Sequence, residues 1–307
     1  MTAPAMVLAS ARHSEQYSPM ADRAPLRLAI VAVALAMAGC SSAPSTTASP
    51  TTGDASAASD TNGVSTIPDP LAVPTLEGRF PIGTEQRKLA LTCWGEGSPA
   101  VLFDAGSGDA GISRWKSSSI TRALAARTQV CAYDRAGLGD SDPPPLHPRV
   151  LDEVVDDLHL LLAAAGIARP IVMVGSSGGG FDVYHHAGRY PDEVAGLVLL
   201  DVPAGQAAIA TSDVPAWDSP DNPEHMDYVA VEHQMAVARL PLPAIPVTVV
   251  TATHGQSSNP DEQKVWLDGS SLPVFVILDG GHNIYDDDPD AVLEQILAVL
   301  DAIGPSQ

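Results

Sequence analysis

A short apolar run that stops at a Gly-x-Ser-x-Gly pattern constrains this chain more than any other feature. Residues 171–174 are Ile-Val-Met-Val, and Gly175, Ser177 and Gly179 follow at alternate positions. Such a pattern is typical of a sharp turn between a strand and a helix, which holds the serine hydroxyl in the open on a strained backbone. A Cβ atom at either glycine would strike the neighbouring strand or the incoming helix. Ser177 is therefore the first candidate nucleophile.

The first 39 residues resemble a signal for secretion. Arg23 and Arg27 precede an uninterrupted apolar run over residues 28–39. This run is too short to cross a membrane as a permanent helix, but its length suits the apolar region of a signal peptide. It ends in Met-Ala-Gly-Cys, which resembles the lipobox of bacterial lipoproteins. In that reading Cys40 carries lipid and becomes the N-terminus, while Met6 and Met20 are alternative starting residues.

We expect residues 40–75 to form a disordered tether and residues 76–307 to form one domain. The tether is rich in Ser, Thr, Ala and Pro, with few large apolar residues that could offset the entropy of ordering. The predicted location is extracytoplasmic and lipid-anchored to the cell membrane, or secreted if Cys40 is not lipidated. The formal net charge of −21 makes nucleic acid an unfavourable partner, because an acidic surface repels phosphates.

The chain has three cysteines. If Cys40 takes lipid, Cys93 and Cys131 remain, each on a predicted strand. In an oxidising compartment they can form a disulfide, and the alternative is two buried free thiols.

Apolar strands alternate with helical patterns along the rest of the chain. This alternation favours a mainly parallel sheet covered by helices on both faces. A stretch around residues 115–127 is predicted as a helix, as is the amphipathic run over residues 290–303. Residues 203–246 break the alternation with many Pro and Asp residues. Because their second half is apolar and compatible with a helix, we expect a small lid there.

Four segments together resemble the α/β-hydrolase superfamily from Leu76 to Ile303. They are residues 101–108, residues 133–141, residues 174–179 and the Gly-Gly-His at residues 280–282. The resemblance implies an α/β-hydrolase fold, with a mostly parallel eight-stranded sheet flanked by helices and a small lid insertion. It also places the strands of Cys93 and Cys131 side by side, which favours the disulfide.

The resemblance implies that His282 is the base that activates Ser177. A free hydroxyl is a poor nucleophile at neutral pH, so the serine needs a partner to take its proton. His282 follows a predicted strand and precedes the last helix, as the family's base does. His254 is the main rival.

The third member of the triad departs from the usual family pattern. Residues 253–259, which follow the penultimate predicted strand, contain no carboxylate. Asp201, directly after the preceding strand, stands at the family's alternative location and is our choice over Asp261. The other reading of Asp201 is a turn residue before Pro203. A carboxylate is wanted because it fixes the imidazole tautomer and stabilises the imidazolium.

The oxyanion donors implied by the resemblance are two backbone N–H groups. One belongs to Gly178, directly after the nucleophile, and the other to Ser107, with Gly106 as the alternative. The Asp134-Arg135 pair is interpreted as the family's structural turn.

These features predict a serine hydrolase, similar to carboxylesterases and lipases, that cleaves a small-molecule ester or related acyl compound through an acyl-enzyme on Ser177. No cofactor and no metal are expected. Peptidase or thioesterase activity is an alternative. A second alternative is a non-catalytic surface-binding lipoprotein on the same fold, which the missing carboxylate after the penultimate strand suggests.

Overall fold

The computed structural model describes residues 69–304 except residues 207 and 258. The predicted signal peptide and most of the predicted tether, including Cys40, lie outside the described residues. Within the described part of the chain, no helix combines the length and the apolar character needed to cross a bilayer.

One eight-stranded sheet forms the centre of the domain, in the spatial order β1-β2-β4-β3-β5-β6-β7-β8. The strands are β1 (Leu76–Ile82), β2 (Arg87–Trp94), β3 (Val101–Asp104), β4 (Val130–Tyr133), β5 (Ile171–Ser176), β6 (Val194–Leu200), β7 (Pro246–His254) and β8 (Leu272–Gly281). β2 is antiparallel to β1 and β4, and all other neighbours are parallel. The predicted mostly parallel eight-stranded sheet is confirmed.

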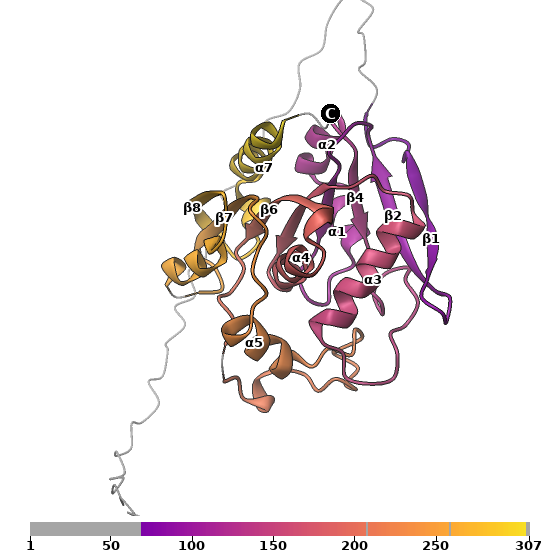
Figure 1. The fold of residues 1–307 in the computed structure, drawn as a ribbon, viewed down its shortest axis with the longest axis vertical. Helices are drawn as coiled ribbons and strands as arrows, with labels where there is room; N and C mark the ends of the chain where they lie inside the picture. Colours follow the sequence, from indigo (N-terminus) through magenta and orange to yellow (C-terminus); the bar gives the residue numbers. More distant parts are fainter. Residues whose placement is uncertain (1–68, 207, 258, 305–307) are drawn as a thin grey trace, which may run out of the picture. The chain divides into compact units, whose positions relative to one another are not determined.

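Helices cover both faces of this sheet (Figure 1). The helices of the described residues are α1 (Gly111–Trp115), α2 (Ser119–Ala125), α3 (Leu151–Ala164), α4 (Gly178–Arg189), α5 (Tyr228–Val237), α6 (Ile284–Asp287) and α7 (Pro289–Ile303), with 3₁₀ turns at η1 (Pro191–Glu193), η2 (Thr211–Asp213) and η3 (Pro260–Leu267). Successive side chains of a strand point to opposite faces, so the central strand β5 feeds two cores. Ile171 and Met173 join the core beneath α3 and α4, whereas Val172 and Val174 join the core beneath α2 and α7.

The helix predicted around residues 115–127 is instead two short helices. α1 ends at Trp115, and α2 begins only at Ser119. Ser118 has an extended backbone, and its hydroxyl accepts a hydrogen bond from the backbone N–H of Ile120 at 3.2 Å. A serine in this position caps a new helix, so the side chain competes with continuation of the first one.

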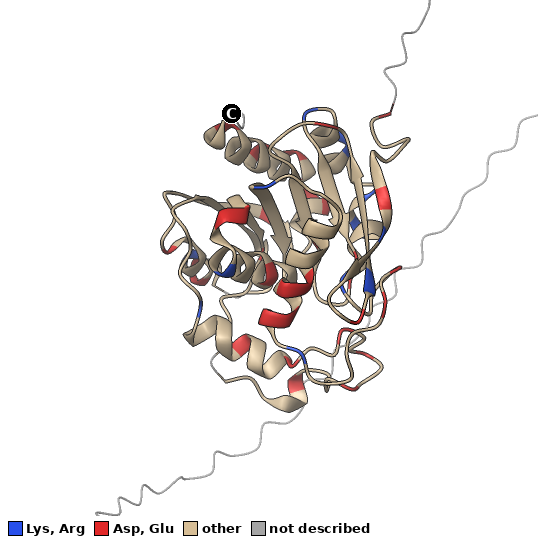
Figure 2. Ribbon diagram, turned by 45° about the vertical axis from the view of Figure 1, so that its right-hand side comes forward, with Lys and Arg blue, Asp and Glu red and all other residues tan. Residues whose placement is uncertain are grey.

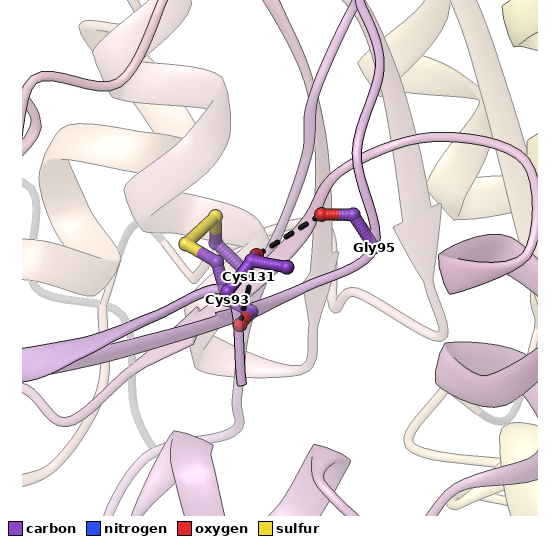
Figure 3. The surroundings of a disulfide bond; sticks show 4 residues. Cys93, Gly95 and Cys131 are labelled. Carbon is purple, nitrogen blue, oxygen red and sulfur yellow. Dashed lines mark hydrogen bonds between the residues drawn. A yellow bond between two sulfur atoms is a disulfide. The ribbon is translucent and has the colours of Figure 1, made fainter. Parts of the chain in front are cut away.

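Cys93 and Cys131 form a disulfide in the structure (Figure 3). They lie directly opposite each other on the antiparallel neighbours β2 and β4. Both are almost fully buried. The Thr75 hydroxyl donates to the carbonyl oxygens of Cys93 and Gly95, which holds the start of β1 against the end of β2. The bridge therefore ties together the half of the sheet that precedes the predicted nucleophile.

Acidic residues are spread over helices and loops across the domain, and basic residues are sparse (Figure 2). Between β6 and β7 the chain leaves the sheet and forms η2 and α5. Several residues of this segment face the cavity described below.

Candidate active site

Ser177 occupies the sharp turn between β5 and α4. Its backbone has φ 50° and ψ −125°, a region that side-chain-bearing residues rarely adopt and that costs on the order of 1–3 kcal/mol. A Cβ atom on Gly175 would come within 2.5 Å of the Gly179 carbonyl oxygen, and one on Gly179 within 2.3 Å of the Ala105 carbonyl oxygen. Both glycines are therefore required by close backbone contacts, as the sequence pattern predicted.

His282 and Asp201 meet although they are 81 residues apart in the chain. Asp201 directly follows β6, and His282 directly follows β8. Because parallel strands end at the same edge of the sheet, the loops after β3, β5, β6 and β8 converge there. The His282 Nδ1 atom lies 2.7 Å from Asp201 Oδ2. A carboxylate only accepts hydrogen bonds, so Nδ1 carries the hydrogen and Nε2 keeps its lone pair.

Asp201 is fully buried and accepts hydrogen bonds from several groups. Besides His282, its partners are the backbone N–H of Gln256 at 2.8 Å, the Gln263 amide at 2.9 Å, and the Thr251 hydroxyl and Ala252 N–H at 3.3 Å each. Burial raises the pKa of this carboxyl, but the hydrogen bonds from His282, Gln263 and the backbone outweigh burial and leave the pKa below its ordinary value. Asp201 is thus held as a carboxylate.

Ser177 and His282 line one cavity of about 450 Å³. Within the described residues no hydrogen bond joins the two side chains. Instead, the side-chain amide of Gln256 lies 3.1 Å from His282 Nε2 and donates to it. The free site therefore holds the imidazole from both sides, with Asp201 at Nδ1 and Gln256 at Nε2.

The two alternative residues from the sequence lie elsewhere. The His254 side chain is 81% exposed, and its nearest acidic partner is Asp279 at 4.0 Å. The Asp261 side chain is 62% exposed and pairs with Lys264 at 2.8 Å. Neither residue lines the cavity that holds Ser177.

The predicted oxyanion donors lie next to Ser177. Ser107 lies close to Gly178. A Cβ atom added to Gly178 would be 3.3 Å from the Ser107 backbone nitrogen. A Cβ atom on Gly106 would lie 3.5 Å from the Ser177 Cβ. The structure thus brings Ser107, Gly106 and Gly178 together around the nucleophile, and their role as donors remains a prediction.

A buried group of charged side chains lies beneath this loop. Arg135 is bound by Asp104 and Glu224, each at 2.6 Å, and Asp182 lies 3.7 Å away. Burial lowers the pKa of Arg135, but the charges of Glu224 and Asp104 outweigh burial and raise it well above its usual range. Burial and the charge of Asp104 raise the pKa of Asp182 well above its ordinary value. Arg135 therefore stays charged, and Asp182 keeps its proton to a higher pH than an exposed aspartate does.

Several residues of the site were not identified from the sequence. Gln256 and Gln263 carry no charge, and the partner expected for His282 is a carboxylate, so neither glutamine stands out in the sequence. Gln263 and Trp266 are the two buried residues of η3, and their spacing of three, which aligns side chains on a 3₁₀ turn, is the signal that the sequence offers. The sequence assigns Arg135 to a structural turn. Glu224 comes from the predicted lid, residues 203–246, which we call the lid segment, and no spacing in the sequence reveals its contacts.

The sheet order, the strained serine turn and the buried carboxylate behind His282 define the class as α/β-hydrolase. Residues 111–264, half of the 307 residues, match the family model described as serine aminopeptidase, S33. The chain belongs to this family of α/β-hydrolases. The matched range contains Ser177 and Asp201 and ends before His282.

Solved structures with the same fold include several hydrolases. An esterase from Thermogutta terrifontis is 19% identical, with a TM-score of 0.56, over 74% of this chain and 99% of that one. The enol-lactonase from Burkholderia xenovorans LB400 is 20% identical, with a TM-score of 0.58, over 73% and 100%. The 2-hydroxy-6-oxo-6-phenylhexa-2,4-dienoate hydrolase from Rhodococcus sp. strain RHA1 is 19% identical, with a TM-score of 0.57, over 74% and 99%.

A curated relative, the probable transporter efuK from Hormonema carpetanum, is 34% identical over 108 residues. The similarity covers 34% of this chain and only 15% of that protein.

Proposed function

We propose that this chain is a serine hydrolase of the carboxylesterase or lipase type, which cleaves a carboxylic ester or related acyl compound through an acyl-enzyme on Ser177. The observation that carries the proposal is the hydrogen bond from His282 Nδ1 to the buried Asp201 carboxylate, because His282 lines the same cavity as Ser177. This contact supplies the acid that the loop after β7 lacks. It therefore favours catalysis over the non-catalytic alternative.

In the first half-reaction the Ser177 Oγ attacks the carbonyl carbon of the ester, and its proton moves to His282 Nε2. Before this proton transfer the Gln256 amide must leave Nε2, to which it donates in the free site. The negative oxygen of the tetrahedral intermediate accepts hydrogen bonds from the backbone N–H groups of Gly178 and Ser107. Collapse breaks the bond to the alcohol, which leaves with the proton from His282.

In the second half-reaction water attacks the acyl-enzyme and gives one proton to His282 Nε2. Collapse of the second intermediate releases the carboxylic acid, and the proton returns to Ser177. Asp201 stabilises the imidazolium in both steps without taking the proton itself.

The direct test is hydrolysis of short p-nitrophenyl esters by the purified domain. We expect Ser177→Ala to lose turnover by at least about 10³-fold while the protein stays folded, because it removes the attacking atom. Unchanged cleavage by this variant would contradict the proposal.

A second candidate is an aminopeptidase-like activity on acyl groups that carry a free amine. Four carboxyl side chains line the cavity, namely Asp109, Asp182, Glu224 and Glu232. Glu232 accepts a hydrogen bond from the Gln206 N–H and is free to accept from a cationic amine as well. The comparison of aminoacyl with simple acyl p-nitroanilides decides between the two. Preference for the aminoacyl compound favours this candidate, and equal or lower rates exclude it.

We also propose that the domain is exported and held at the cell membrane through lipid on Cys40 and the tether. The Cys93–Cys131 disulfide supports an oxidising compartment. The Cys40→Ala variant should move from the membrane fraction to the soluble fraction. Persistence of this variant in membranes would contradict lipidation.

A further inference from the structure

Arg135 binds the backbone of the loop that carries the predicted oxyanion donors. Its Nη1 donates to the Ala105 carbonyl oxygen at 2.6 Å, and its Nη2 donates to the Gly106 carbonyl oxygen at 2.7 Å. The two carbonyls belong to the peptide groups whose N–H atoms are those of Gly106 and Ser107.

Through the geometry of the trans peptide, these contacts set the direction in which the N–H groups point. In a planar trans peptide the C=O and N–H bonds point in opposite directions. A guanidinium that holds the Gly106 oxygen therefore turns the Ser107 N–H away from itself. The Ser107 nitrogen lies on the side of Gly178, next to Ser177. The rigid fork of one guanidinium thus sets the direction of both candidate donors on this loop.

Arg135 is itself held by buried carboxylates. Its Nη1 also donates to Asp104 at 2.6 Å, and its Nε donates to Glu224 Oε1 at 2.6 Å. The second oxygen of Glu224 accepts from the Gly108 N–H at 2.7 Å. Arg135, Asp104 and Glu224 are each at most 5% exposed. Glu224, from the lid segment, thus binds both the loop and the arginine that orients it.

We infer that Arg135 is a positioning residue for the oxyanion peptides of this hydrolase, and that Glu224 of the lid segment holds Arg135 in place. The inference rests on the proposed function, because an oxyanion forms only if Ser177 attacks a carbonyl. It assigns to the Asp-Arg turn a role beyond local structure, since the guanidinium acts on the transition state through two backbone groups.

Two variants test the role of Arg135 and Glu224. Arg135→Lys keeps the positive charge but cannot hold two carbonyls and a carboxylate from one planar fork. Glu224→Gln replaces one carboxylate oxygen with an NH₂ group, which can only donate, so either Arg135 Nε or the Gly108 N–H loses its acceptor. For each we expect kcat on a p-nitrophenyl ester to fall about 10- to 100-fold, with KM within about threefold of wild type. The inhibition constant of a trifluoromethyl ketone, which forms an oxyanion on the serine, should rise in proportion.

Matched controls separate this effect from a general loss of structure. Arg87→Lys changes an arginine that pairs with Asp157 at 2.6 Å, away from the cavity. Asp221→Asn changes an exposed carboxylate on the same lid segment. Both controls should keep wild-type kcat. If Arg135→Lys does not fold, Glu224→Gln, which keeps the size and shape of the side chain, decides the question.

Hydrogen exchange of the 105–109 backbone gives a readout that does not depend on turnover. In Glu224→Gln we expect these amides to exchange at least about tenfold faster than in wild type, because the loop loses an anchor. If the wild type cleaves no acyl substrate, the proposed function fails and the oxyanion role fails with it, whereas faster exchange in Glu224→Gln would still show that Glu224 anchors this loop. Unchanged exchange, or a kcat within twofold of wild type in both variants, would overturn the inference.

Discussion

At the scale of single residues, the environment of Asp201 decides which carboxyl group can assist His282. Asp201 is buried, ionised and in contact with Nδ1, whereas Asp261 is exposed and paired with a lysine. Contact with Nδ1 and burial both favour Asp201, because a carboxylate shielded from water interacts more strongly with an imidazolium.

The prediction is that Asp201→Asn lowers kcat on a p-nitrophenyl ester by about 10²–10⁴-fold, since the amide no longer stabilises the imidazolium and can select the wrong tautomer. Asp261→Asn, the matched exposed control, should keep near-normal kcat. Near-normal turnover in both variants would show that the assignment of the acid is wrong.

Asp182 gives a second prediction, about stability. Burial and the charge of Asp104 raise its pKa in the folded protein, so folding takes up a proton at pH values between the unfolded and the folded pKa. Stability from this group therefore decreases as pH rises above the unfolded value of about 3.9. Asp182→Asn, which resembles the neutral acid, should unfold at a higher urea concentration than wild type at pH 7.

The same comparison at low pH serves as the control for Asp182. Below a pH of about 3.9 the Asp182 carboxyl group is protonated in both the folded and the unfolded state. The difference in unfolding free energy between wild type and Asp182→Asn should therefore shrink toward zero. A variant less stable than wild type at pH 7 would mean that Asp182 is charged and stabilising there.

At the scale of elements, the disulfide between β2 and β4 closes a loop of 38 residues that contains β3, α1 and α2. Closing a loop of this length in the unfolded chain is worth about 4 kcal/mol in the chain-entropy model. We expect Cys93→Ser with Cys131→Ser to lose stability of about this size, measured by urea unfolding. The edge of the sheet that carries the candidate active site is built mainly by other strands, so kcat of the folded variant should change less than about threefold.

The strands and long helices could be predicted from the sequence because their apolar patterns are local. The run over residues 171–174 and the glycines after it indicate β5 and the turn without any knowledge of distant contacts. The pattern predicts one helix across Ser118 because the free energies of helix continuation and of capping by a serine differ little.

The supporting contacts of the site could not be predicted for a different reason. Gln263 reaches Asp201 across 62 residues, and Glu224 reaches Arg135 across 89 residues. No periodicity encodes such pairs, because each depends on how a loop or the lid segment folds back over the sheet.

At the scale of the whole molecule, one edge of the parallel sheet collects the reactive groups from four separate loops. The lid segment closes over this edge and contributes Glu224, Met226, Tyr228, Val231 and Glu232 to the cavity. Burial and the charge of Glu224 raise the pKa of Tyr228 to about 12, so its hydroxyl stays protonated beside Ser107. The lid segment therefore supplies part of the cavity wall and, through Glu224, part of the support for the loop of Ser107.

The central claim is that His282 activates Ser177 for covalent attack, and the mass of the intact protein after exposure to a fluorophosphonate tests it most directly. We predict one adduct per chain, located on Ser177, absent in Ser177→Ala and formed at least about 10²-fold more slowly in His282→Ala. No adduct on the wild type, or an equally fast reaction without the imidazole, would contradict the claim.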